Sequence, residues 1–486
     1  MNKLAAIGRS ASLSMLVKTL VLGVLLLLLC IPLNMIESLI DERGNSAHLA
    51  AAELRETYVG AQTLIGPLIV VPYTEYWQTV ERGDKDKPDQ LINHSAERMT
   101  LWFPRQWSLD GELTPEERYR GLFTVLFYRL NGAARGQFAP FDQAQLLHYE
   151  KDSRIEVGTP VLTLRVSDLR GLQGAPQLTA AGQPLTFARQ SAALPARSPL
   201  SAGVHAPLTG AALDAFRAGQ ALPFTLELTL TGQQTLAVVP LGEDTDARLH
   251  SSWPHPSFGG RFLAAERSVG ERGFDARWRV AALTSQAREQ LRDLAYTDRG
   301  GDAFAQVERF DVSFVQPVNV YSMSSRAVRY GFLFIALTLM AVFMVELFAR
   351  LRLHPVQYLL VGLAIAVFFM LLIALSEKIG FIWAYASAAG ASALLLASYF
   401  SAVLRSARRG LTLAGFVALL YAVLYGLLAS ESNALLLGAL LVFAMLAALM
   451  LATRHVDWWN LTSSRKNPDA LTPTVPAFAP PPPPPH

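Results

Sequence analysis

The segment richest in residues that could do chemistry is 251–260, which reads SSWPHPSFGG. A serine beside a histidine can act as an activated nucleophile, and here Ser257 would pair with His255. Residues adjacent in sequence rarely form such a set, however, and two prolines make the segment a rigid turn. We therefore favour a packed loop with Trp253 and Phe258 in the core. A loop that binds a partner is the functional alternative, and these four residues are its candidates.

A second candidate is a pair of arginines, Arg118 and Arg120, just before a predicted strand at 122–128. Alternate residues of an extended chain project from one face, so both guanidinium groups could clamp a carboxylate or a phosphate. The favoured alternative is that they form salt bridges with acids of their own domain.

The third candidate is a short basic turn between two apolar runs, at 347–362. Pro355 suits the first position of a helix, and the residue before it suits the cap. We expect this structural role, with a regulatory contact as the alternative. The candidate residues of the turn are Arg350, Arg352, His354, Pro355 and Gln357.

Sequence patterns of enzymes and metal sites are missing. The chain has no GxSxG, P-loop or HExxH sequence, and its single cysteine, Cys30, can form neither an internal disulfide nor a paired-cysteine metal site. The sequence therefore predicts a protein that is not an enzyme and holds no cofactor or metal.

Six apolar runs are each long enough to cross the ~30 Å hydrocarbon core of a bilayer. They lie at 16–36, 330–348, 356–375, 381–403, 411–428 and 435–451. The first follows Lys3, Arg9 and Lys18 and has no small-x-small cleavage site, so it predicts an uncleaved signal anchor. Pro32 is expected to kink that helix or end it early.

The basic residues between the runs predict the orientation. Short loops rich in Arg and Lys stay in the cytoplasm, which places both termini and the 347–362 turn there. Acidic residues are scarce in the runs, and Glu346 is expected to pair with Arg350 four residues on. A transporter coupled to ions usually needs charge near the middle of the bilayer, which these runs lack.

Residues 37–328 are then expected outside the cytoplasm. They hold 34 of the 39 acidic residues and 29 of the 42 basic ones, and the net positive remainder flanks membrane spans, so we expect no nucleic-acid partner. Apolar β-type runs separated by Gly, Pro and Asn or Asp predict antiparallel strands, with a helix near 46–59. We expect two β-rich lobes, at 60–173 and 208–315.

The predicted fold is therefore a membrane protein with a signal-anchor helix, a large mainly-β domain outside the cytoplasm and a C-terminal bundle of five helices. The tail at 452–486 ends in PAFAPPPPPPH, which predicts a disordered extension of polyproline type. A passive tail is the favoured interpretation, and a proline-binding partner is the alternative.

Several of these motifs together resemble the CreD family of inner-membrane, cell envelope integrity proteins. LRLHPVQYLLVG followed by LSEKIGF is similar to that family's signature, and the likeness extends over most of the chain up to about residue 460. The other matching motifs are GPLIVVPY, RYRGLF, SDLRG, SSWPHPSFGGRFL, GFDARW and DWW.

The resemblance implies a multi-pass protein of the Gram-negative inner membrane with a large periplasmic domain. It also implies control by a carbon-source-responsive two-component system, with links to tolerance of E-group colicins and to the β-lactam response. It supplies no catalytic residues.

Three functions are open at this point. The favoured one is non-enzymatic envelope maintenance, in which the periplasmic domain docks an envelope protein or glycan and the bundle anchors it in the lipid bilayer. The second is a transporter or lipid-handling protein that uses a cavity in the bundle. The third is a hydrolase with Ser252 or Ser257 and His255. The sequence does not predict an oligomeric state.

Overall fold

A computed structural model describes residues 2–81, 90–191, 194, 198–295, 303–316, 320–349, 353–430 and 434–454. The chain divides into two compact units. The first combines Met1–Gly44 with Val318–His486, and the second is Asn45–Pro317.

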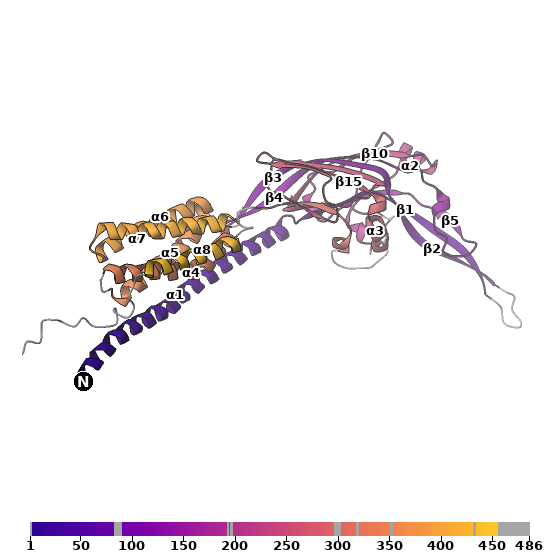
Figure 1. Ribbon diagram of the computed structural model, residues 1–486. Helices are drawn as coiled ribbons and strands as arrows, with labels where there is room; N and C mark the ends of the chain where they lie inside the picture. The colour runs from indigo at the N-terminus through magenta and orange to yellow at the C-terminus, as the bar shows by residue number, and fades with distance from the viewer. Residues whose placement is uncertain are drawn as a thin grey trace, which may run out of the picture. The chain divides into compact units, whose positions relative to one another are not determined.

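The first unit is helical, as the sequence predicts (Figure 1). Its helices are α1 (Asn2–Thr57), of which the residues from Asn45 on belong to the second unit, α4 (Val320–Ala349), α5 (Pro355–Ile379), α6 (Phe381–Val403), α7 (Ala407–Ala429) and α8 (Ala434–Thr453). Over the described residues five of them, α1 and α4 to α7, are long and apolar enough to cross a membrane. The sixth predicted span is α8, which holds a shorter apolar stretch at Leu436–Ala448.

The first helix does not end at Pro32, contrary to the expectation of an early end. α1 continues through the proline, although the ring removes one backbone hydrogen bond. Packing accounts for the continuity, because the side chains that follow the helical repeat on either side of the proline are buried against the bundle. These are Leu29, Leu33, Ile36 and Ile40. Gly362 of α5 leaves room for the Leu29 side chain of α1, since a Cβ there would lie 2.1 Å from Leu29.

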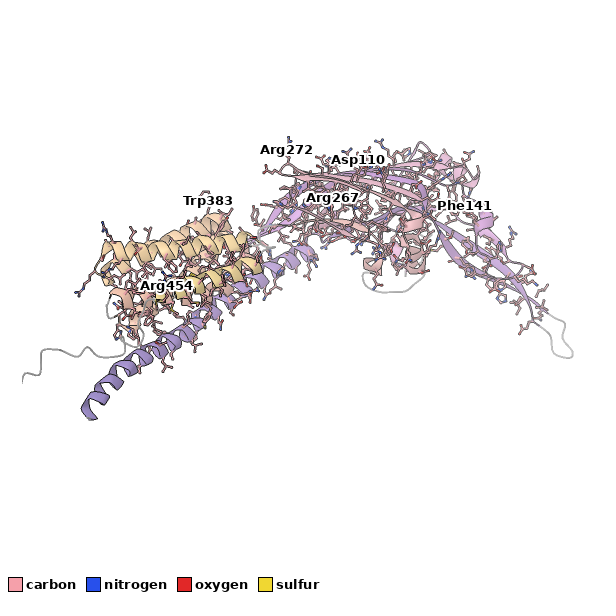
Figure 2. All side chains as sticks on the ribbon, in the orientation of Figure 1. Asp110, Phe141, Arg267, Arg272, Trp383 and Arg454 are labelled. Carbon is pink, nitrogen blue, oxygen red and sulfur yellow. The ribbon has the colours of Figure 1, made fainter. Side chains whose placement is uncertain are left out.

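Aromatic rings fill the centre of the bundle. The ring of Phe368 on α5 lies 4.4 Å from that of Tyr421 on α7 and 5.5 Å from that of Tyr385 on α6. The Tyr385 hydroxyl donates to the Tyr421 carbonyl at 2.7 Å, so this buried hydroxyl has a partner that carries no charge. Trp383, by contrast, is 71% exposed and points away from the bundle, as a lipid-facing side chain would (Figure 2).

One buried carboxylate joins α1 to the bundle. Glu346 on α4 is 6% exposed and forms a salt bridge with Lys18 on α1. It also accepts hydrogen bonds from the Tyr358 hydroxyl and, at 3.0 Å, from the Leu353 backbone N–H. The expected partner, Arg350, lies outside the described residues, and sequence spacing alone could not predict the contact with Lys18.

The second unit is built on two eight-stranded sheets. In the first sheet the strands run β13 (Pro256–Gly260), β16 (Phe310–Phe314), β11 (Thr235–Val238), β1 (Gln62–Glu81), β6 (Val161–Val166) and β9 (Val204–Pro207), with β2 (Gln90–Trp102) and β5 (Arg154–Val157) also paired to β1. β1 and β2 extend together beyond the rest of the sheet (Figure 1).

The second sheet carries the exposed polar face. Its order is β14 (Glu266–Gly270), β15 (Gly273–Ala281), β12 (Asp244–Ser251), β3 (Pro104–Arg120), β4 (Phe123–Phe138), β10 (Leu222–Gln233), β7 (Gln177–Ala180) and β8 (Gln183–Leu185). Pairing is antiparallel as predicted, except for the parallel pairs of β1 with β11 and of β12 with β3.

The main core lies between the two sheets. Trp278 of β15 stacks on Phe310 of β16 with ring centroids 4.8 Å apart, and Tyr128 of β4 stacks on Phe314 of β16 at 5.5 Å. The Tyr128 hydroxyl donates to the Thr235 carbonyl at 2.9 Å, which ties one sheet to the other. A second core covers the other face of β1, where α3 (Ala287–Ala295) packs. α2 (Gly210–Arg217) packs into the main core.

The two sheets do not divide the chain at the ranges predicted for two lobes. Strands from 60–173 and from 208–315 contribute to both sheets, because β11 and β16 join β1 while β12 and β15 join β3. Lobes contiguous in sequence therefore differ from the observed arrangement, a single sandwich in which distant segments pair.

Glu75 on β1 is a fully buried carboxylate that holds the 149–153 segment. It accepts from the backbone N–H groups of Tyr149 and Glu150 at 2.8 and 3.0 Å, and from Ser153 and Arg98 at 2.7 Å. Burial alone would raise the pKa of Glu75, but these four hydrogen bonds to the charged form outweigh burial and lower it to about 2.

Acid should therefore weaken the β domain through Glu75. The unfolded chain takes up the proton near the ordinary pKa of 4.5, so the stabilisation is complete above that pH and is lost as the pH falls towards 2. We expect Glu75→Gln to cost about 2 kcal/mol at neutral pH and to flatten the acid dependence. Denaturant unfolding of the full chain in detergent measures both. Glu97→Gln, at an exposed position of β2, should change neither; an equal effect would contradict this role for Glu75.

A second prediction concerns the buried pair in the bundle. Lys18→Met leaves the Glu346 carboxylate without its countercharge and should cost about 2 kcal/mol, below the ~3–5 kcal/mol of a fully buried pair because the Lys18 side chain is 27% exposed. Adding Glu346→Gln should restore most of this loss, measured as thermal stability in detergent. Lys378→Met is the matched control. A double variant as unstable as the sum of its parts would show that the two residues do not interact.

Candidate functional site

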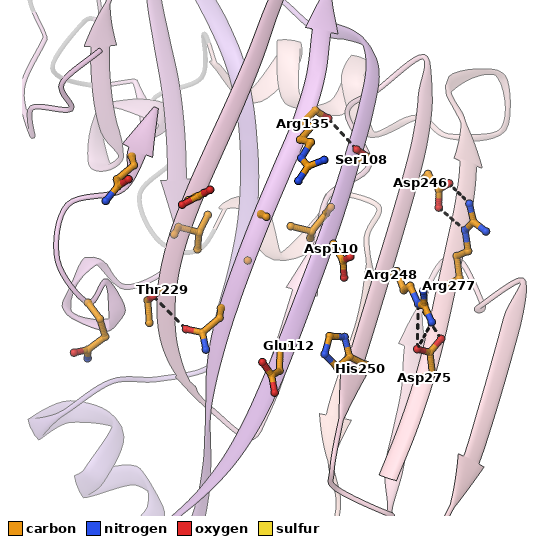
Figure 3. Close-up of a pocket in the computed structure, with 18 of the residues that line it drawn as sticks. Ser108, Asp110, Glu112, Arg135, Thr229, Asp246, Arg248, His250, Asp275 and Arg277 are labelled. Atoms are coloured by element: carbon orange, nitrogen blue, oxygen red, sulfur yellow. Dashed lines mark hydrogen bonds and ion pairs between the residues drawn. The ribbon is translucent and has the colours of Figure 1, made fainter. Parts of the chain in front are cut away.

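A polar hollow of about 950 Å³ lies on the outer face of the second sheet (Figure 3). Its floor is β3, β4 and β12, and residues of β10, β15, β14, β7 and the segment before β7 complete it. The inward side chains of these strands fill the main core, so the alternate, outward positions are polar. The hollow is thus the solvent face of a sheet whose other face is fixed by packing.

The register of the strands brings the lining residues into rows. One row runs Arg277, Arg248, Asp110, Ala133 and Glu227 across β15, β12, β3, β4 and β10. The small side chain of Ala133 leaves the floor low at the centre of this row. The sheet is therefore hollowed where two carboxylates stand on either side of an alanine.

A neighbouring row runs Asp275, His250, Glu112, Asn131 and Thr229 across the same five strands. Figure 3 shows His250 beside Glu112, and Thr229 donates to Asn131 at 3.2 Å. Carboxylate, imidazole, amide and hydroxyl groups thus alternate along this row.

One wall of the hollow is held by ion pairs between β12 and β15. Arg277 donates to Asp246 at 2.8 and 2.5 Å, and Arg248 donates to Asp275 with a shortest contact of 2.8 Å. The hydrogen bond from Arg277 lowers the pKa of Asp246, and the bond to Asp275 raises the pKa of Arg248. These half-exposed pairs add little stability, but they fix where the guanidinium groups lie.

The centre of the hollow has carboxylates without such partners. Six acidic side chains and three arginines line it. Within the part of the chain that the structure describes, Asp110, Glu112 and Glu227 form no salt bridge, and the guanidinium of Arg135 forms none either. This arrangement leaves an excess of negative charge available to a ligand.

A second recess of about 590 Å³ shares four residues with the hollow, which are Asp110, Arg248, His250 and Asp275. Ser252 and Arg272 line it as well. Among the described residues no hydrogen bond joins His250 to Ser252, so the recess shows a polar surface and no assembled nucleophile.

The loop predicted at 251–260 is corrected in part, because its second half is strand β13 and Trp253 and Phe258 are half-buried against the main core rather than inside it. The indole of Trp253 donates to the carbonyls of His255 and Val315 at 3.1 and 3.2 Å. Phe258 meets the rings of Phe274 and Trp278 edge-on at 5.6 and 5.7 Å.

The polar members of that loop are not brought together. His255 and Ser257 are exposed, and Ser257 pairs across the sheet with Ser313. No hydrogen bond between described residues links His255 to Ser252 or Ser257.

Arg118 and Arg120 lie against the last turns of α1 rather than in the hollow. Arg118 stacks on the Tyr58 ring at 4.0 Å and donates to its hydroxyl at 2.9 Å, and Glu116 lies 3.6 Å away. Arg120 donates to Glu53 at 3.0 Å. Both arginines thus contact acids and a ring of their own unit, as the favoured alternative expects.

The basic turn is a helix cap where it is described. His354 Nδ1 accepts from the Val356 N–H at 3.3 Å, and the Gln357 side chain accepts from the His354 N–H at 2.9 Å. Pro355 occupies the first position of α5, as predicted. Arg350 and Arg352 lie outside the described residues.

Sequence reasoning missed the hollow. Its only signal is the alternation of polar residues in β3 and β12, for example Ser108, Asp110 and Glu112. That pattern is typical of any solvent-facing strand, and the register that joins these distant segments cannot be read from either one.

Comparison with known proteins supports the early resemblance. The family model described as inner membrane protein CreD matches residues 14–459. The inner membrane protein CreD of Escherichia coli (strain K12) is 34% identical over 438 residues, which cover 89% of this chain and 91% of that protein.

A solved structure gives no further support. The two-domain M1 zinc metallopeptidase bound to L-arginine covers 43% of this chain and 42% of its own, at 9% identity and a TM-score of 0.20, too low to carry an argument. The family match over most of the length is decisive by itself: the chain belongs to the CreD family of inner membrane proteins.

Proposed function

We propose that this inner membrane protein is a non-catalytic docking protein that contributes to the integrity of the cell envelope. In this proposal the β domain binds an envelope protein or glycan through the polar hollow, and the helices anchor it in the bilayer. The observation that supports it best is the 950 Å³ hollow, whose central carboxylates have no salt-bridge partner among the described residues. Tolerance of E-group colicins and the β-lactam response are the cellular properties that this binding would affect.

We further propose that the β domain is periplasmic and that both termini are cytoplasmic. The support is the distribution of basic residues in the short segments between helices. Those assigned to the cytoplasm carry Arg350, Arg352, Arg405, Arg408, Arg409, Arg454, Arg465 and Lys466, whereas those assigned to the periplasm carry only Lys378.

Thiol labelling tests this orientation. In a Cys30→Ser background, Glu97→Cys on β2 should react with a membrane-impermeant maleimide in spheroplasts, because the reagent reaches the periplasmic face. Ser464→Cys should react only after lysis. The reverse pattern would place the β domain in the cytoplasm.

A second candidate function, the handling of a lipid, is favoured by an apolar groove of about 540 Å³ in the bundle. Side chains of α4, α7 and α8 line it, among them Leu337, Met340, Phe416 and Met445. Its apolar wall suits an acyl chain better than a polar solute.

Photocrosslinking in cells separates these functions. A photoreactive residue at Gln177, on the rim of the hollow, should capture an envelope protein or glycan, and one at Glu156, on the first sheet, should not. Ala133→Phe should abolish the capture, because the ring fills the hollow without removing a polar group. The same substitution should impair restoration of colicin and β-lactam phenotypes in a deletion strain.

The other outcomes are equally informative. Equal capture at both positions, or none at Gln177, would overturn docking through the hollow. Capture of lipid alone, from a photoreactive residue at Ala341 in the groove, would favour the second function.

A further inference from the structure

Three carboxylates of the hollow have no salt-bridge partner within the described ranges, and they are spaced along and across the sheet. Asp110 and Glu112 lie two residues apart on β3, which corresponds to about 7 Å. Asp110 and Glu227 lie two strands apart in one row, which corresponds to about 10 Å. Three anions at such separations match several cationic groups on one ligand better than a single ion.

A metal ion is not the matching ligand. Over the described residues the structure has no group of three or more His, Cys, Asp or Glu side chains placed to hold a metal. The carboxylates are too dispersed to share one cation at ligand distance, which is about 2–2.6 Å for the metals that prefer oxygen.

The remaining lining suits the backbone of a peptide. Asn131, Gln173 and Gln177 supply amides that both donate and accept. The guanidinium of Arg135, in the next row, forms no salt bridge with a described residue and can donate to carbonyl groups. A chain with a regular series of N–H and C=O groups satisfies such a surface.

The length of the hollow is also that of a short peptide. From β15 to β7 it crosses six strands, and five spacings of ~4.8 Å make about 24 Å. An extended peptide advances ~3.3 Å per residue, so about seven residues span this distance.

We propose that the hollow binds an extended, basic peptide segment of an envelope protein. Its Lys or Arg side chains pair with Asp110, Glu112 and Glu227, and its backbone contacts the amides and Arg135. Charge complementarity supports this choice, because among the described residues three lining carboxylates but only one lining arginine form no salt bridge. The proposal rests on the docking function above and names the class of its partner.

Peptide binding to the full chain in lipid nanodiscs tests the proposal. The probe is a fluorescein-labelled (Lys-Ser)4 peptide, followed by anisotropy, with (Glu-Ser)4 as the probe of opposite charge. We expect the lysine peptide alone to bind, and to bind more weakly as the salt concentration rises.

Charge-neutral variants locate the contact. The pair Asp110→Asn and Glu227→Gln should weaken binding about tenfold, as expected for the loss of two accessible ion pairs. The matched pair Glu97→Gln and Glu156→Gln removes two exposed carboxylates outside the hollow and should leave the affinity unchanged.

Several results would overturn the proposal. They are an absence of binding, equal binding of both peptides, equal weakening by the two variant pairs, or displacement of the peptide by spermidine at an equal concentration. Capture of a glycan at Gln177 together with such a result would refute the basic peptide and keep the docking function. If a photoreactive residue at Gln177 captured nothing, the docking function itself would be refuted.

Discussion

The β domain depends on β1, a strand that is buried on both faces. Leu64, Ile69 and Val71 belong to the core between the sheets, whereas Ile65, Leu68 and Val70 belong to the core under α3. A strand covered on both sides reads as a continuous apolar run rather than an alternating one, which explains the sequence LIGPLIVVPY. Because β1 also pairs with β2, β5, β6 and β11, it fixes the register of most of its sheet.

The polar hollow is a consequence of this arrangement. A second core that includes α3 covers part of the outer face of the first sheet, whereas the polar hollow lies on the exposed outer face of the second. Its inward residues, such as Trp107, Leu109 and Leu113, are buried in the core. Core packing does not constrain the outward residues between them, so these can be polar or charged. A row of carboxylates around Ala133 is therefore compatible with a stable domain and not required by it.

Much of the fold could be predicted from the sequence, since long apolar runs and β-type runs are local signals. The apolar helices and the strand predicted at 122–128, which forms the first part of β4, follow directly from them. The division into lobes could not be predicted, because β3 pairs in parallel with β12, more than a hundred residues away. The hollow depends on the same long-range register, so no segment by itself reveals it.

Two of the motifs that the sequence analysis singled out hold the end of α1 instead of lining the hollow. Arg170 of SDLRG is held by Asp168 and donates to the Arg55 and Glu56 carbonyls at the end of α1, where unpaired carbonyls and the helix dipole favour a cation. Arg118 of RYRGLF covers Tyr58 from the other sheet. An arginine next to each sheet thus contacts the same end of α1. Residues that look reactive in the sequence can thus be needed to hold the end of α1. The residues available to a ligand lie instead at the outward positions of β3 and β12, whose alternation is typical of any exposed strand.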